Sequence, residues 1–208
     1  MHLYDSTIPS GNAYKVQLLL AHLKISYQTT SLNIVATPSE TRTESFLKLN
    51  PNGRIPVLVL DDGTPLAESN AILFYLAEET PFLPSDRLAR AQVLQWLFFE
   101  QYSHEPYLAV WKFQTYWGDI SRLAESEVKK LKEKGQAAID VMERHLEGRE
   151  WFVSEQFSIA DVALYAYTCA AEAVGFSVGE NVRAWLARVE SVEGHVRIRK
   201  DPTGKCPL

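Results

Sequence analysis

The stretch from Asn50 to Glu79 constrains the fold more than any other part of this 208-residue chain. In order, it reads as a turn, a strand, a hairpin turn, a second short strand and a helix, over 50–54, 57–60, 61–64, 65–67 and 68–79. Pro56 stands directly before the first strand, although proline has no N–H to give to a sheet. The backbone at Ile55 is therefore available to a partner other than the sheet.

The Ile55–Pro56 bond and the Glu68-Ser69 pair each allow two interpretations. A cis bond would let Ile55 present its N–H and its C=O to an extended peptide, as an added strand does. Only about 5–6% of X–Pro bonds in folded proteins are cis, so a trans proline is the default. At the helix start, free N–H groups and the positive end of the dipole suit a carboxylate, but Glu68 or Ser69 can also be a simple cap.

Short strand and helix patterns alternate in the first part of the chain. They cover 2–5, 13–23, 27–32 and 37–49, ahead of the strands and helix already described, with Pro38 near the first turn of the last of these four. A break with two prolines follows at 79–86, and beyond it no strand pattern appears. The sequence predicts an α/β domain over 1–78, a linker over 79–87 and an all-helical domain over 88–208.

Helix patterns fill this second domain. A strongly aromatic one runs over 87–117, and Pro106 is expected to bend or break it near Tyr102. A second amphipathic helix is predicted over 121–146, with Gly148 as its C-cap.

The last third of the chain contains a clear helix start. Ser158 and Asp161 form a capping-box pair in front of an apolar helix. A further helix is predicted over 180–192, and a last short one near Val196.

Charge and cysteine usage exclude several classes of function. The net charge is -5, whereas binding to nucleic acid or to an anionic membrane requires a basic face. No leader peptide and no apolar run of membrane-spanning length is visible, so a cytoplasmic protein is expected. The two cysteines are far apart in the sequence. Cys169 reads as a small buried hydrophobe and Cys206 as part of a mobile tail, and neither receives a role.

Two motifs of the chain together resemble a known family. Asn-Pro-x-Gly-Arg-Ile-Pro-Val-Leu from Asn50, followed by Glu-Ser-x-Ala-Ile-x-x-Tyr-Leu from Glu68, resembles the glutathione-binding half of the cytosolic glutathione transferases, in particular bacterial, serine-type, theta-like members. The resemblance implies a thioredoxin-like first domain in which Pro56 is cis and Glu68 and Ser69 hold the γ-glutamyl end of reduced glutathione. The Ser-Ile-Ala-Asp cap at 158–161 resembles the family's all-helical second domain, and the family as a whole implies a homodimer.

Such an enzyme must stabilise a thiolate, because an unperturbed thiol has a pKa of about 8.5. Ser10 lies where the first helix begins, in a segment that resembles the Ser-x-x-Cys-x-x-Val of serine-type transferases, with Ala13 in place of the cysteine. A hydroxyl donor and a helix N-terminus would both favour the thiolate. The alternatives are that Ser10 is only an N-cap, or that Tyr4 or Asn12 is the donor.

The resemblance also implies how the substrates are held. Arg54 would pair with the glycyl carboxylate of glutathione, unless it is a solvated turn arginine. The acceptor would lie against Tyr107, Val110 and Trp111, whose alternative is packing in the core or at a dimer interface.

The function predicted from these residues is conjugation of the thiolate of glutathione to an apolar electrophile, a detoxification reaction. Two alternatives stay open: a non-catalytic glutathione-binding module, and a glutathione-dependent isomerase or dehalogenase. Disulfide exchange through a protein thiol is disfavoured, because neither position 10 nor position 13 is a cysteine. The five histidines show no ligand spacing, and phosphate-binding loops are absent from the sequence, so neither a metal nor a nucleotide is expected.

Overall fold

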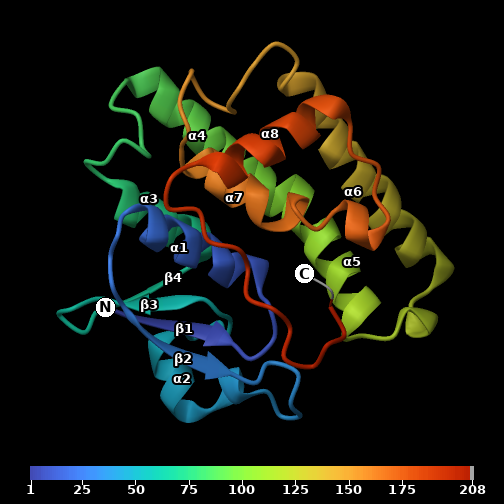
Figure 1. Ribbon diagram of the computed structural model, residues 1–208. Helices are drawn as coiled ribbons and strands as arrows, with labels where there is room; N and C mark the ends of the chain where they lie inside the picture. The colour runs from blue at the N-terminus through green and yellow to red at the C-terminus, as the bar shows by residue number, and fades with distance from the viewer. Residues whose placement is uncertain (207–208) are drawn as a thin grey trace. The chain divides into compact units, whose positions relative to one another are not determined.

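The computed structural model describes residues 1–206 (Figure 1). The chain divides into two compact units: Met1–Glu78 together with the segment from Glu193 onward, and Glu79–Val192. This division differs from the predicted boundaries at one place: the sequence predicts a helical domain that continues to residue 208, whereas the segment after Val192 packs with the first unit.

The first unit is built on a four-stranded mixed sheet in the order β2-β1-β3-β4. Its strands are β1 (His2–Ser6), β2 (Gln28–Leu32), β3 (Val57–Val59) and β4 (Pro65–Ala67). β1 and β2 are parallel, with α1 (Gly11–His22) between them in sequence, whereas β3 runs antiparallel to both β1 and β4. The predicted mixed sheet with helices on its faces, a thioredoxin-like α/β arrangement, is confirmed.

Helices cover both faces of this sheet (Figure 1). On one side, α1 packs against α3 (Ser69–Ala77), and α2 (Glu44–Leu49) lies on the other side. The core of the unit contains fully buried aliphatic side chains from the sheet and from the two packed helices: Leu3, Val16, Leu19, Leu20, Val57, Leu58, Ile72 and Leu73. This burial of apolar area stabilises the unit and fixes where the strand ends lie.

The helix predicted from Pro38 begins later than expected. A 3₁₀ turn, η1 (Glu40–Arg42), comes first, and α2 follows it. Thr43 interrupts the helix because its backbone is extended and its hydroxyl accepts the N–H of Phe46 as an N-cap.

Within its described residues, the second unit contains helices and no strand. Its elements are α4 (Arg87–Phe99), the π-helical turn η2 (Glu100–His104), α5 (Glu105–Tyr116), η3 (Ile120–Arg122), α6 (Glu125–His145), α7 (Ile159–Thr168), η4 (Glu172–Val174) and α8 (Glu180–Ser191). The break predicted near Tyr102 is confirmed as the π-helical turn. Pro106 explains it, because proline has no N–H to bond the carbonyl one turn earlier.

Two further helix ends differ from the sequence prediction. The helix expected from residue 121 begins at Glu125, because Asp119 caps a separate 3₁₀ turn by accepting the N–H and hydroxyl of Ser121. Gly148 is not the C-cap of α6. That position belongs to Leu146 in a right-handed conformation, and Gly148 follows with a φ of 69°, which suits the next turn.

The described segment after Val192 contains no helix, so the short helix expected near Val196 is wrong. The segment instead makes hydrogen bonds to its own unit: Tyr14 Oη donates to the carbonyl of Val196 at 2.6 Å. Asp201 then accepts the N–H groups of Lys205 and Cys206. Cys206 is buried, which contradicts the prediction of a mobile tail.

Asp161 connects three segments of the second unit through the predicted capping box. Its buried carboxylate accepts the N–H and hydroxyl of Ser158 at 2.9 and 3.0 Å, the N–H of Phe152 at 3.2 Å and the indole N–H of Trp185 at 3.0 Å. Burial raises the pKa of Asp161 to about 6, since the four donors offset only part of the lost hydration.

Replacing Asp161 with alanine is expected to lower the free energy of unfolding by about 3 kcal/mol or more, because several buried donors lose their acceptor at once. Urea unfolding followed by circular dichroism measures the change. Asp140→Ala is the matched control, since Asp140 is exposed on α6, and it should change stability by less than about 0.5 kcal/mol. Similar losses in the two variants would contradict this view of Asp161.

Candidate functional site

The register of the sheet brings the predicted glutathione-binding residues to one end of the first unit. Tyr4 pairs with Val57, so the end of β1 lies beside the start of β3. Val57 also pairs with Ala67, so the end of β4 lies there too. The loop to Ser10, the Ile55–Pro56 bond and the Glu68-Ser69 pair therefore emerge from the same end of the sheet.

Ser10 is the N-cap of α1. Its backbone is extended, and its hydroxyl oxygen accepts the N–H of Ala13 at 3.4 Å, a long bond. Ser10 therefore caps the helix, and its role as the thiol donor stays a prediction. Because an accepting hydroxyl still carries its own hydrogen, Ser10 can donate that hydrogen to a sulfur placed at the helix N-terminus.

The loop that carries Ser10 is anchored on the buried carboxylate of Asp5. Asp5 accepts the N–H of Ser6 at 2.6 Å and the side-chain amide of Gln17 at 2.8 Å. Burial raises the pKa of Asp5, against the effects of the Ser6 N–H and of the Arg199 charge. Arg199 also donates to the carbonyl of Ile8 at 3.4 Å, so the segment after Val192 supports this loop.

The Ile55–Pro56 bond is cis, as the family resemblance implied and against the default from frequency alone. The turn before it is held by Asn50, whose side-chain amide donates to the carbonyl of Arg54 at 2.8 Å. Arg54 itself is exposed, and Ile55 is half-buried. Arg54 is therefore accessible to a ligand, and Ile55 is partly accessible.

Glu68 has an unusual backbone conformation, with φ 68° and ψ 112°. Residues other than glycine rarely adopt positive φ, and a strained residue persists where its surroundings impose it, frequently at a binding site. Within the described residues, no side chain caps the first turn of α3. Glu68 is exposed while Ser69 is buried, so the carboxylate faces solvent beside an N-terminus with open N–H groups.

A buried lysine that the sequence reasoning missed lies beside these residues. Lys15 Nζ donates to Asn12 Oδ1 at 2.8 Å and to Ser69 Oγ at 3.4 Å, and Ser69 Oγ donates to the same Asn12 oxygen at 3.2 Å. A sequence signal for its burial does exist: Lys15 lies at helical spacing from Leu18, Leu19 and His22, so it shares the buried face of α1.

Tyr4, the alternative thiol donor, faces the side of the sheet that α2 covers. Its ring packs edge-on against Phe46 of α2, with centroids 5.9 Å apart, and lies 4.8 Å from the ring of His2. This arrangement fits the interpretation of Tyr4 as a half-buried strand residue.

The three residues proposed for the acceptor lie on α5 of the second unit. Trp111 is buried, its indole N–H donates to the carbonyl of Val174 at 2.8 Å, and Lys132 lies over its ring at 4.9 Å. The core-packing alternative therefore describes Trp111. Tyr107 is half-buried and Val110 is exposed, so both can contact a ligand.

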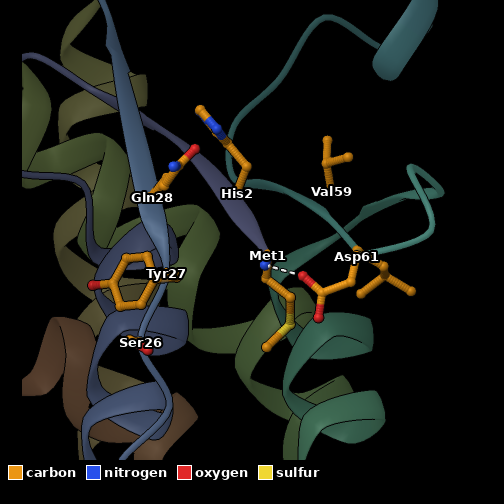
Figure 2. A pocket seen from close by; sticks show the side chains of 8 residues that line it. Met1, His2, Ser26, Tyr27, Gln28, Val59 and Asp61 are labelled. Carbon is orange, nitrogen blue, oxygen red and sulfur yellow. Dashed lines mark hydrogen bonds and ion pairs between the residues drawn. The ribbon is translucent and has the colours of Figure 1, made fainter.

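A surface hollow of about 480 Å³ lies at the opposite end of the sheet. It is formed where β1 and β2 begin and β3 ends, by Met1, His2, Ser26, Tyr27, Gln28, Val59, Leu60 and Asp61. Figure 2 shows the ion pair between the Met1 ammonium and the Asp61 carboxylate among these residues. The hollow contains none of the predicted site residues.

Residues 1–206 contain no group of three His, Cys, Asp or Glu side chains that could hold a metal ion. In the same range, every helix is too short or too polar to cross a membrane.

Known proteins match both halves of the chain. Residues 1–78 match the glutathione S-transferase N-terminal domain, and residues 94–193 match the glutathione S-transferase C-terminal domain. A crystal structure of a glutathione S-transferase from Pseudomonas fluorescens is 46% identical, with a TM-score of 0.88 over 94% of this chain and 97% of the other. A glutathione transferase from Burkholderia graminis, with two glutathione molecules bound per subunit, is 28% identical, with a TM-score of 0.79 over 93% and 84%. The disulfide-bond oxidoreductase YfcG of Escherichia coli is 29% identical over 88% of this chain and 87% of its own.

Proposed function

Because this chain belongs to the glutathione S-transferase family, we propose that it conjugates the thiolate of reduced glutathione to an apolar electrophile in the cytoplasm. The observation that carries the proposal is the convergence of three segments at one end of the sheet: Ser10 at the start of α1, the cis Ile55–Pro56 bond, and the Glu68-Ser69 pair. Each segment offers the group that one part of the tripeptide requires.

Glutathione would bind in an extended conformation across this end of the sheet. The N–H and C=O of Ile55 pair with its backbone as an added strand does. The exposed carboxylate of Glu68 holds the γ-glutamyl ammonium, and the N–H of Ser69 at the start of α3 holds the neighbouring carboxylate. Arg54 pairs with the glycyl carboxylate, and buried Pro56 keeps the turn in place.

The bound thiol then loses its proton to solvent, favoured by the Ser10 hydroxyl and by the N-terminus of α1. A sulfur lone pair attacks the electrophilic carbon and forms a C–S bond. The leaving group departs with the electrons of the broken bond, and the tripeptide contacts hold the sulfur in position for attack.

The acceptor would contact Tyr107 and Val110, the accessible members of the predicted set. Trp111 supports them indirectly by fixing α5 to the Val174 carbonyl.

A second candidate is reduction of disulfides, favoured by the similarity to the oxidoreductase from Escherichia coli. Positions 10 and 13 carry no thiol, so the thiolate of glutathione itself would attack the disulfide. A mixed disulfide forms, one thiolate leaves, and a second glutathione completes the exchange. Turnover of 2-hydroxyethyl disulfide against turnover of an aryl halide separates the two reactions.

A homodimer is also proposed, supported by an exposed apolar stripe on the second unit. Leu94, Phe98 and Tyr102 follow one another at four-residue spacing along α4 and η2 and are 36%, 70% and 84% exposed. Exposed apolar patches of this kind are typical of protein interfaces.

Ultraviolet titration of the thiolate of bound glutathione tests the proposed function. The pKa of the bound thiol should lie at least about one unit below the free value in the wild-type protein. It should return toward the free value in Ser10→Ala, and Tyr4→Phe should leave it unchanged because Tyr4 packs on Phe46. Binding without any lowered pKa in the wild-type protein would favour the non-catalytic binding module.

Glu68→Gly is expected to separate stability from binding. Glycine relieves the positive φ, so the free energy of unfolding should rise by about 1 kcal/mol. Glutathione affinity, measured by calorimetry, should fall about tenfold or more because the ammonium loses its partner. Glu68→Ala should lose the affinity without the gain in stability, and unchanged affinity in both variants would refute the role given to the carboxylate.

Phe98→Glu should halve the molar mass measured by light scattering, because a charge in the apolar stripe opposes its burial. Lys134→Glu changes an exposed residue of α6 and is the matched control. A wild-type monomer would contradict the proposed dimer.

A further inference from the structure

We propose that Lys15 is a positioning residue, which orients the side-chain amide of Asn12 so that its NH₂ group faces the thiol of bound glutathione. The inference rests on the proposed function and extends it to a buried residue outside the set of proposed glutathione contacts. It starts from the buried contacts among Lys15, Asn12 and Ser69.

The chemistry of the ammonium determines which way the amide lies. A lysine ammonium can only donate hydrogen bonds, so the Asn12 atom that lies 2.8 Å from Lys15 Nζ must be the oxygen. Ser69 Oγ donates to the same oxygen at 3.2 Å. With its oxygen held on this side, the amide carries Nδ2 and its two hydrogens on the other side.

The position of Asn12 in α1 places this NH₂ group near the thiol. Asn12 lies in the first turn of α1, directly after the cap Ser10 and Gly11. Ser69, which would hold the γ-glutamyl carboxylate, is the first residue of α3, and α3 packs against α1. The Lys15 contacts therefore join the part of the site that meets the γ-glutamyl group to the part that meets the sulfur.

The orientation of the amide decides the sign of its effect on the sulfur. An N–H donor directed at the sulfur stabilises the thiolate. A reversed amide would direct its oxygen at the sulfur and favour the protonated thiol instead. Lys15 thus ensures that Asn12 assists the Ser10 hydroxyl.

The stability of the fold does not explain why position 15 carries a lysine. The Lys15 side chain is 0% exposed, and moving an ammonium out of water is costly. Methionine has a similar length and would fill the same space without that cost. The lysine therefore adds hydrogen-bond geometry that an apolar residue cannot supply.

The test is the ultraviolet titration of bound glutathione applied to Lys15→Met. The pKa of the bound thiol should rise by about one unit toward the free value, because the amide is no longer held. In an Asn12→Ala background the same substitution should add no further shift, since Lys15 acts through Asn12. An equal shift in both backgrounds would indicate a direct effect of the ammonium charge and would overturn the positioning role.

Asn12→Asp provides a second variant that keeps Lys15 in place. Its carboxylate preserves an oxygen for Lys15 and Ser69 but puts a second oxygen where the NH₂ group was, so the thiol pKa should rise above the wild-type value. An unchanged pKa would overturn the proposal, even where Lys15→Met fails to fold by circular dichroism. Lys24→Met, at an exposed lysine just after α1, is the control and should leave the pKa unchanged.

The outcomes separate this inference from the function on which it rests. A wild-type protein whose bound thiol keeps the free pKa would refute the proposed transferase mechanism itself. A lowered wild-type pKa that Lys15→Met leaves unchanged would refute only the role of Lys15.

Discussion

The antiparallel pairing of β3 with both of its neighbours is the constraint on which the candidate site depends. Because β3 runs opposite to β1 and β4, its first residue, Val57, pairs with Tyr4 in the second half of β1 and with Ala67 at the end of β4. Segments that are distant in the sequence are thereby brought to one end of the sheet. The buried Val57 and Leu58 fix this register, since a slip by one residue would exchange the two faces of the strand.

Two helix N-termini lie at this same end of the first unit, and together they determine its electrostatic character. α1 begins soon after β1, and α3 begins directly after β4. Each contributes open N–H groups and the positive end of a helix dipole, and the ammonium of Lys15 is buried beside them. A tripeptide with two carboxylates and an ionisable thiol suits such a surface.

The sequence predicted most of the fold, because its strands, turns and helix caps rest on local signals, whereas the roles of the site residues stay predictions. The hairpin turn at 61–64 and the capping box at Ser158 are each specified within a few residues, and the structure contains both. Family resemblance was needed for the cis bond, which frequency alone disfavours. The strained φ of Glu68 has no local sequence signal.

The features that the sequence did not predict depend on contacts between distant segments. In the sequence, Lys15 looks like an ordinary polar helix residue, because its partner Ser69 lies 54 positions later in the chain. The sequence also does not reveal the hydrogen bonds that hold the segment after Val192. They join Tyr14 to the carbonyl of Val196 and Arg199 to the carbonyl of Ile8, across most of the length of the chain. Trp111 was read as a ligand contact because the carbonyl that accepts its indole N–H, that of Val174, comes much later in the chain.

The return of the chain to its first unit after Val192 has a consequence for how such proteins can diverge. In topological terms, the helical unit is an insertion between Glu78 and Glu193, attached to its host at both ends. Recombination that exchanges the helical unit between relatives must therefore join two junctions correctly. A single crossover would also replace the segment after Val192. Ile8 and Asp5, in and before the loop to Ser10, would then meet a residue from another protein in place of Arg199.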